Sequence, residues 1–266
     1  MVMANTESST LRHNAFRETM VIAARGLRRY TRLPQLLFFT SAQPIMILFV
    51  FDFVFSGMFN SAVPGGKYID FLLPGLLVQM VMFGGVQTGI GLAEDMSAGI
   101  IDRFRSLPMS SIAVIAGRTL SDAVRNIVAL LIMVVLGYGL GFRFHGAVLD
   151  ASAMLGLNIL FGYVLSWAFA FIGMAVKNAG AAEAASMVLI FPLSFASSAF
   201  VPVSTMPHWL RIFAVNQPVT FLVDASRSLA LGISDNGATW KLLLWCGALF
   251  LIFVPLAVGR YRRIAE

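Results

Sequence analysis

Six apolar runs, each long enough to cross a lipid bilayer as a helix, dominate the sequence and leave few other folds open to it. A membrane-spanning helix needs about 20 predominantly apolar residues. Apolar residues make up 58% of this chain of 266 residues, whereas a soluble domain has roughly 45–50%. We expect an all-α integral membrane protein with six transmembrane helices, at residues 35–58, 70–92, 120–142, 152–175, 183–203 and 238–259.

Basic residues at the two ends of the chain predict how these spans are oriented. From about Arg12 to Leu33, apolar and basic side chains fall on opposite faces of a helix, which is typical of an amphipathic helix lying in the headgroup plane. Pro34 ends this helix. If the N-terminus is cytoplasmic, the cytoplasmic segments hold thirteen of the nineteen Lys and Arg residues, as the positive-inside rule requires. We therefore expect both termini to be cytoplasmic.

The same pattern divides the chain into three parts. We expect a cytoplasmic tail and interfacial helix at 1–34, a six-helix transmembrane domain at 35–260 and a short cytoplasmic tail at 261–266. The net charge of +6 arises near the predicted ends of spans, so it concerns membrane topology and predicts no nucleic-acid partner.

The longest charged interruption between spans is the segment from Glu94 to Asp122, which this topology places in the cytoplasm. Phe104 and Leu107 continue an apolar stripe that begins at Ile100 or Ile101, and Pro108 stops the helix. The segment therefore predicts a short amphipathic helix, a stop and a restart. A solvated loop and a docking surface for a soluble partner are both compatible with this pattern.

The segment from Ser204 to Gly232 contains two apolar helices, each too short to span a membrane. Pro207 lies near the start of the first helix, the sequence Asn216-Gln217-Pro218 separates the two, and Gly232 ends the second. We expect an extracytoplasmic re-entrant or interfacial hairpin between the fifth and sixth spans.

Few polar groups lie inside the predicted spans. Gln79 and Gln87 face the same side of the second span, where they can line a water-filled path or form hydrogen bonds between helices. Asp52 and Glu183 lie near span ends. The sequence contains no G-x-x-x-x-G-K-[ST] loop and no His/Cys/Asp cluster with metal-ligand spacing, so we expect no nucleotide site, metal site or catalytic residue on this chain.

Three segments together resemble one known family, the ABC-2-type exporter permeases, and most closely the daunorubicin-resistance permease subfamily. The resembling residues are Tyr68, Asp70, Phe71, Pro74 and Gly75, then Glu94, Asp95, Gly99, Arg103, Arg105, Pro108, Gly117, Arg118 and Asp122, and finally Pro207, Trp209, Asn216, Pro218, Arg227 and Gly232. The likeness covers about residues 15–260. Ser111 departs from it, because the family often has an arginine there.

The resemblance implies a homodimer of this chain bound to two copies of a separate ATP-binding-cassette ATPase subunit. ATP and Mg would then bind the partner ATPase, and this chain would hold no cofactor. The cytoplasmic helix would be the coupling helix that contacts the ATPase, through Glu94, Asp95, Gly99, Asp102, Arg103, Phe104, Arg105, Leu107 and Pro108. The hairpin, with Pro207, Trp209, Asn216, Pro218, Arg227 and Gly232, would cap the exit of the substrate path.

Our leading hypothesis is therefore a permease subunit in a bacterial plasma membrane, exporting an amphiphilic drug or a lipid and surrounded by membrane lipids. Gln79 and Gln87 are the candidates for the translocation path. Two alternatives stay open. An ion-coupled secondary transporter would use Asp52 or Glu183 as its coupling acid. A scaffold that transports nothing would keep the docking segment but would not need the hairpin.

Overall fold

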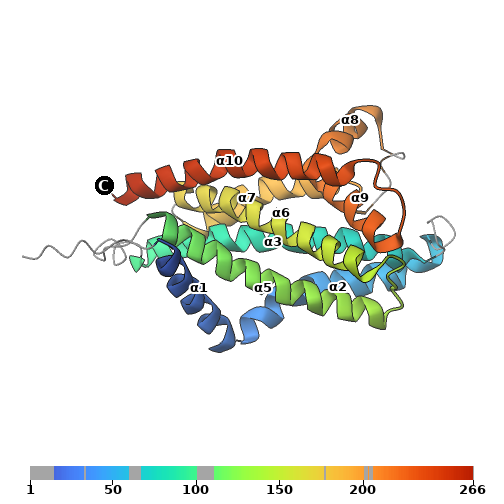
Figure 1. The fold of residues 1–266 in the computed structure, drawn as a ribbon, viewed down its shortest axis with the longest axis horizontal. Helices are drawn as coiled ribbons and strands as arrows, with labels where there is room; N and C mark the ends of the chain where they lie inside the picture. The colour runs from blue at the N-terminus through green and yellow to red at the C-terminus, as the bar shows by residue number, and fades with distance from the viewer. Residues whose placement is uncertain are drawn as a thin grey trace, which may run out of the picture.

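The protein is a bundle of long helices, and α3 lies at its centre (Figure 1). The computed structural model describes residues 15–32, 34–59, 67–100, 111–176, 178–200, 203 and 206–265. Within these residues the helices are α1 (Ala15–Arg32), α2 (Pro34–Phe59), α3 (Tyr68–Ser97), α5 (Ser111–Gly139), α6 (Val148–Val176), α7 (Ala179–Phe195), α8 (His208–Asn216), α9 (Pro218–Leu231) and α10 (Ala238–Ala265).

Four of these helices are long and apolar enough to cross a membrane. They are Tyr68–Ser97, Ile112–Gly139, Val148–Val176 and Ala238–Arg263, and they contain most or all of the predicted second, third, fourth and sixth spans. Two shorter apolar stretches, Ala42–Val54 and Ala179–Phe195, coincide with parts of the predicted first and fifth spans. The all-helical membrane fold is therefore confirmed, with four full-length candidate spans among the described residues.

The boundary of the predicted fifth span differs from the helix found there. α7 begins at Ala179 because the side chain of Asn178 accepts a hydrogen bond from the Ala181 amide at 3.1 Å. It ends at Phe195 rather than at residue 203. The Ser197 hydroxyl donates to the Ser194 carbonyl and accepts from the Ala199 amide, so local side-chain bonds replace the helical ladder there.

Glycines let α3 and α6 pack at close range. A Cβ atom on Gly89 would lie 2.5 Å from the carbonyl oxygen of Phe169, and one on Gly162 would lie 3.1 Å from Cβ of Val81. Gly173 likewise faces the backbone of Gly89. Gly162 and Gly173 therefore bring α6 close to α3.

The amphipathic helix α1 packs on α5 at one end of the bundle, which we call the α1 end. A Cβ atom on Gly117 would lie 2.6 Å from Cβ of Ile22, and one on Gly26 would lie 2.5 Å from Oγ of Ser121. Ala23 is buried, whereas Phe16 is 70% exposed. Figure 1 shows the C-terminal end of α10 and the end of α3 at this same end of the bundle, and α8 at the opposite end, which we call the α8 end.

The two short helices of the predicted hairpin are α8 and α9, and they differ sharply in burial. Nearly every residue of α9 is buried, against α3, α6 and α10, whereas α8 buries only Ala214. Gly232 ends α9 in the left-handed conformation, with φ of 67°, as the sequence predicts. The second helix of the hairpin is therefore part of the core of the bundle.

Candidate functional site

A network of charged side chains near the α1 end of the bundle includes Asp95, Arg118, Asp122 and Arg125. Arg118 on α5 contacts Asp95, near the end of α3, at 2.7 Å and also contacts Asp122, one turn further along α5, at 3.3 Å. Asp122 also pairs with Arg125 at 3.6 Å. The Asp122 side chain is only 1% exposed. A carboxylate buried this deeply is stable only when it is paired, and both arginines supply that pairing.

Arg118, Asp122 and Arg125 are spaced four and three residues apart, so they pair along one face of α5. The partner on α3 was not predicted, because Asp95 is 23 residues away in sequence. Gly91, one turn before Asp95, provides the space for the Arg118 guanidinium, since a Cβ atom on Gly91 would collide with Nη2 of Arg118. The network therefore fixes the end of α3 against α5.

The other predicted coupling residues have different positions. Glu94 is exposed at the end of α3, where its carbonyl accepts a hydrogen bond from the Ser97 hydroxyl at 2.9 Å. Gly99 has a φ of 68°, which suits a glycine in the turn that follows α3. The remaining predicted coupling residues, Asp102, Arg103, Phe104, Arg105, Leu107 and Pro108, lie outside the described residues.

Beyond Arg125 the network reaches a cavity inside the bundle. The Arg125 guanidinium donates to the carbonyl of Gly84 at 2.9 Å and to Oδ1 of Asn126 at 3.3 Å. Gly84 and Asn126 both line a cavity of about 290 Å³ between α2, α3, α5 and α7. Side-chain contacts therefore run without a break from Asp95, beside the predicted coupling segment, to the cavity wall.

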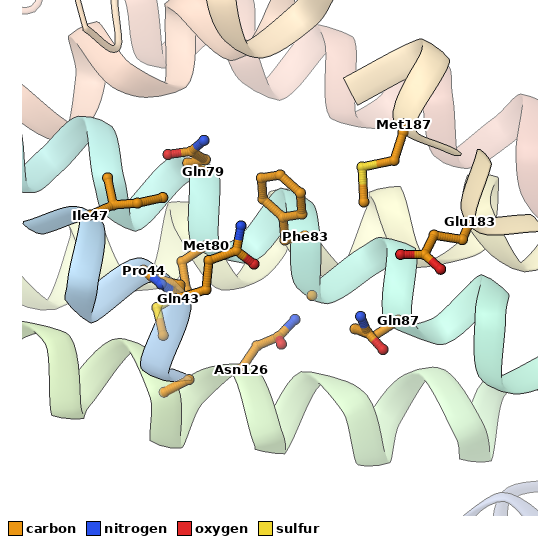
Figure 2. A pocket seen from close by; sticks show the side chains of 12 residues that line it. Gln43, Pro44, Ile47, Gln79, Met80, Phe83, Gln87, Asn126, Glu183 and Met187 are labelled. Atoms are coloured by element: carbon orange, nitrogen blue, oxygen red, sulfur yellow. The ribbon is translucent and has the colours of Figure 1, made fainter. Parts of the chain in front are cut away.

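The cavity contains both residues that the sequence analysis assigned to a translocation path. Figure 2 shows Gln79 and Gln87 along α3, with Gln43 on α2, Asn126 on α5 and Glu183 on α7 around the same space. Neither Gln79 nor Gln87 makes a side-chain hydrogen bond to another described residue. Phe83, Met80 and Met187 supply apolar surface. The cavity therefore combines amide groups, one carboxylate and apolar walls.

A second polar cluster lies near the α8 end, around Arg227 of α9. The Arg227 guanidinium donates to the carbonyl of Phe71 at 3.1 Å and to that of Ala199 at 3.0 Å, and it lies 3.6 Å above the Phe71 ring. Gly75 allows this arrangement, because a Cβ atom there would lie 2.5 Å from the Ala199 carbonyl oxygen. Residues of two separate sequence motifs, Phe71 to Gly75 and Arg227, thus meet at one point.

Asp224 balances part of the Arg227 charge. Its carboxylate lies 3.9 Å from Arg227 and accepts a hydrogen bond from the Ser198 hydroxyl at 2.7 Å. Burial lowers the pKa of Arg227 to about 10, so it keeps its charge at neutral pH. Burial also raises the pKa of Asp224, although the Ser198 bond and the Arg227 charge act in the opposite direction.

The junction between α8 and α9 is held by buried polar contacts and borders an apolar pocket. Gln217 is buried, and its amide donates to the carbonyl of Ala196. Pro218 follows at the first position of α9, which suits a residue without an amide hydrogen. Both residues line an apolar pocket of about 460 Å³ between α6, α7 and α10.

The other predicted hairpin residues are at the surface. Pro207 precedes α8, Trp209 is 73% exposed, and Asn216 is exposed with its amide bonded to the Ile212 carbonyl at 2.9 Å. They do not join the Arg227 cluster. Sequence reasoning did not assign Ser198, Ala199, Gln217 or Asp224 to the site. Gln217, a polar residue between two apolar helices, was the one available signal.

Comparison with known proteins agrees with these motifs. Residues 17–231, which include both polar clusters and the cavity, match a family model described as "ABC-2 type transporter". The chain is 33% identical over 251 residues to the daunorubicin resistance ABC transporter permease protein DrrB1 of Streptomyces coeruleorubidus, covering 94% of this chain and 88% of that protein. It is 31% identical over 215 residues to the doxorubicin resistance ABC transporter permease protein DrrB of Mycobacterium tuberculosis strain H37Rv, covering 77% of this chain and 72% of that protein.

Proposed function

The chain belongs to the ABC-2 type transporter family, and we propose that two copies of it form the membrane part of an exporter driven by two copies of a separate ATPase. The chain is a permease subunit and not an enzyme by itself, because in such transporters ATP is hydrolysed on another chain. ATP and Mg act on that subunit. The energy for transport therefore reaches this chain from ATP hydrolysis on the separate ATPase subunit.

We place the chain in a bacterial plasma membrane, with six spans formed by α2, α3, α5, α6, α7 and α10 and with both termini cytoplasmic. The excess of Lys and Arg in the segments assigned to the cytoplasm supports this orientation. So does the arrangement of the bundle, in which α1 and the C-terminal end of α10 lie at the same end (Figure 1). In this topology the α1 end faces the cytoplasm, membrane lipids surround the spans, and the hairpin caps the outer exit.

The proposed coupling route begins at the cytoplasmic segment between α3 and α5. In our proposal the residues that contact the ATPase are Glu94, Asp95, Gly99, Asp102, Arg103, Phe104, Arg105, Leu107 and Pro108. A movement of this segment pulls on Asp95, and Arg118 transfers the displacement to α5. The single observation that carries this proposal is the unbroken series of contacts from Asp95 through Arg118, Asp122 and Arg125 to the cavity wall.

The coupling route is tested by counting substrate molecules exported per ATP hydrolysed in proteoliposomes that hold the permease with its ATPase. We expect Arg118→Met to lower this ratio while the ATPase stays bound, because α3 and α5 then move independently. Arg262→Met removes an exposed charge from the last turns of α10 and serves as the control. An unchanged ratio in Arg118→Met would show that the network is not part of the coupling route.

The proposed substrate is an amphiphilic compound, either a drug or a lipid. The relatives are named for resistance to daunorubicin and doxorubicin, and the cavity offers both amide groups and apolar walls. We assign Gln79 and Gln87 to the translocation path because both line this cavity.

An ion-coupled secondary transporter is the second candidate, and the presence of Glu183 in the cavity is the observation that favours it. Uptake into sealed vesicles distinguishes the two. An ATP-driven exporter stops when ATP is withheld and is unaffected by collapsing the proton and sodium gradients. A secondary transporter shows the opposite behaviour.

A further inference from the structure

The described residues that line the cavity between α2, α3, α5 and α7 carry an acidic side chain but no basic one. Glu183 is the one ionisable side chain among the described residues that line it, and no described Lys or Arg does so. The other polar lining groups are the amides of Gln43, Gln79, Gln87 and Asn126. The carboxylate and the negative ends of the amide dipoles attract a positively charged group, whereas a second anion would be repelled by Glu183.

The two arginines of the neighbouring network have other acidic partners. Arg125 lies behind the wall, where its guanidinium bonds to Gly84 and Asn126 and pairs with Asp122. Arg118 pairs with Asp95 and Asp122. Both arginines of this network are therefore paired with aspartates.

Glu183 is exposed on α7, and it forms no ion pair with any described residue. Figure 2 shows its carboxylate extending from α7 toward the cavity, on the same side as Met187 and across from α3. An ionisable group among apolar spans is costly unless it meets water or a partner of opposite charge. Its position at the cavity edge gives a cationic ligand direct access to it.

The remaining wall suits the apolar part of such a ligand. Ile47, Met80, Phe83, Ala129 and Met187 contribute apolar surface. Phe83 also offers an aromatic face, which attracts cations. Methionine side chains adapt their shape to different ligands. A volume of about 290 Å³ is near the lower end of the range for small-molecule sites.

We propose that this cavity binds an organic cation, with the charged group beside Glu183 and the apolar body against Phe83, Met80 and Met187. The inference rests on the proposed function, since it names the substrate class of the path assigned above. The carboxylate of Glu183 favours a ligand with a positive charge, and the flexible apolar wall accommodates ligands of different shapes. Neutral and anionic amphiphiles of the same size bind more weakly.

The test uses the complete permease–ATPase complex in nanodiscs of phosphatidylcholine, whose headgroups carry no net charge. Binding is followed by fluorescence with two probes that differ only in charge. One is a dansyl-labelled alkyl chain ending in trimethylammonium, and the other ends in a neutral tert-butyl group of the same shape. We expect the cationic probe to bind at least tenfold more tightly, a difference of about 1.4 kcal/mol.

Two variants assign the preference to Glu183. Glu183→Gln keeps the size of the side chain and is expected to abolish the difference between the probes, whereas Glu183→Asp keeps the charge and most of the difference. Glu266→Gln removes the same charge from the last residue of the sequence and is expected to change nothing. Equal binding of both probes by the unchanged protein, or equal weakening of both by Glu183→Gln, would overturn the proposal.

Failure of the proposed function gives a different result. ATP hydrolysis and ATP-driven efflux are measured on the same preparations. A charge preference that depends on Glu183, found together with transport driven by a proton gradient without ATP, supports the cation site and rejects the ATP-driven exporter. ATP-driven efflux of both probes at equal rates, unaffected by Glu183→Gln, rejects the cation site and supports the exporter.

Discussion

At the scale of single residues, the charged groups inside this bundle are stabilised mainly by pairing. Asp122 has an arginine on each side, one turn before and one turn after it on α5. Arg227 satisfies two backbone carbonyls and lies on an aromatic ring, which uses the planar shape of guanidinium in a way that lysine cannot match. The Arg227 contacts join segments that are distant in sequence, as does the pair of Arg118 with Asp95.

Asp122 is expected to matter more for stability than Asp95. Asp122→Ala leaves two arginines in a region of low exposure, so we expect a loss of about 3 kcal/mol in the free energy of unfolding. Asp95 is 22% exposed and pairs with one arginine among the described residues, so Asp95→Ala should cost about 1 kcal/mol. Unfolding in nanodiscs, followed by tryptophan fluorescence, measures both. Equal losses for the two variants would contradict this ranking.

Asp224 is expected to make stability depend on pH. Because its pKa is raised in the folded protein, the folded state binds its proton more tightly than the unfolded state does. Its favourable contribution is therefore fully present below the ordinary pKa of 3.8 and is lost as pH rises through the raised value.

The difference in unfolding free energy between the unchanged protein and Asp224→Asn, measured from pH 3.5 upward, isolates this contribution. We expect the unchanged protein to lose stability relative to the variant as pH rises through the raised pKa. A difference that stays constant, or that changes in the opposite direction, would mean that burial does not control this carboxylate.

At the scale of helices, the crossings depend on glycines that bring backbones close together. The α1–α5 crossing uses Gly26 and Gly117, and the α3–α6 crossing uses Gly89 and Gly173. The first crossing is the more exposed one, because only Ala23 of α1 is buried among the described residues of that helix. The strength of the α1–α5 crossing determines how far the amphipathic helix α1 moves together with α5.

Gly117→Val is expected to displace α1 from α5. The added side chain would meet Ile22 and the Thr19 carbonyl, so we expect a loss of about 1–3 kcal/mol in unfolding free energy. Gly156→Val is the matched control, since nothing lies within 4 Å of a Cβ atom at Gly156 of α6. Cross-linking yield between cysteines placed on α1 and α5 measures the displacement directly. A Gly117→Val protein as stable as the control would exclude a tight crossing.

Much of the helix pattern could be predicted from the sequence, because its signals are local. These signals are the spacing of apolar residues, Pro34 at a helix boundary and Gly232 at the end of a helix. The two short helices and the break at Pro218 were found where expected. The contact from Arg118 to Asp95 and the contacts from Arg227 to Phe71 and Ala199 could not be predicted, since they depend on how helices pack. The same is true of Glu183 and Gln87 lining one cavity.

At the scale of the whole molecule, the bundle contains two polar layers. It also contains a cavity that is lined by residues of α2, α3, α5 and α7. The Arg118 network joins α3 to α5 near the α1 end, and the Arg227 cluster joins α9 to α3 near the α8 end. In the proposed topology these layers face the cytoplasm and the exterior. α3 contributes residues to both layers, so a movement of α3 changes contacts at both ends of the bundle.

The hairpin is expected to affect transport more than assembly. Pro218→Ala restores an amide hydrogen at the start of α9, next to the buried Gln217 that bonds to Ala196. We expect export to change while the amount of bound ATPase stays the same. Export rate and co-purified ATPase, measured on one preparation, test this expectation. Unchanged export would count against a functional hairpin.

The most direct test of the central claim is purification of the chain from native membranes in mild detergent, followed by native mass spectrometry and an ATP-hydrolysis assay. The account predicts a complex of two copies of this chain with two copies of an ATPase that has a phosphate-binding loop. It also predicts that Arg105→Glu weakens that complex or its coupling to transport. A chain that purifies alone, or with a partner that hydrolyses no ATP, would contradict an ATP-driven exporter.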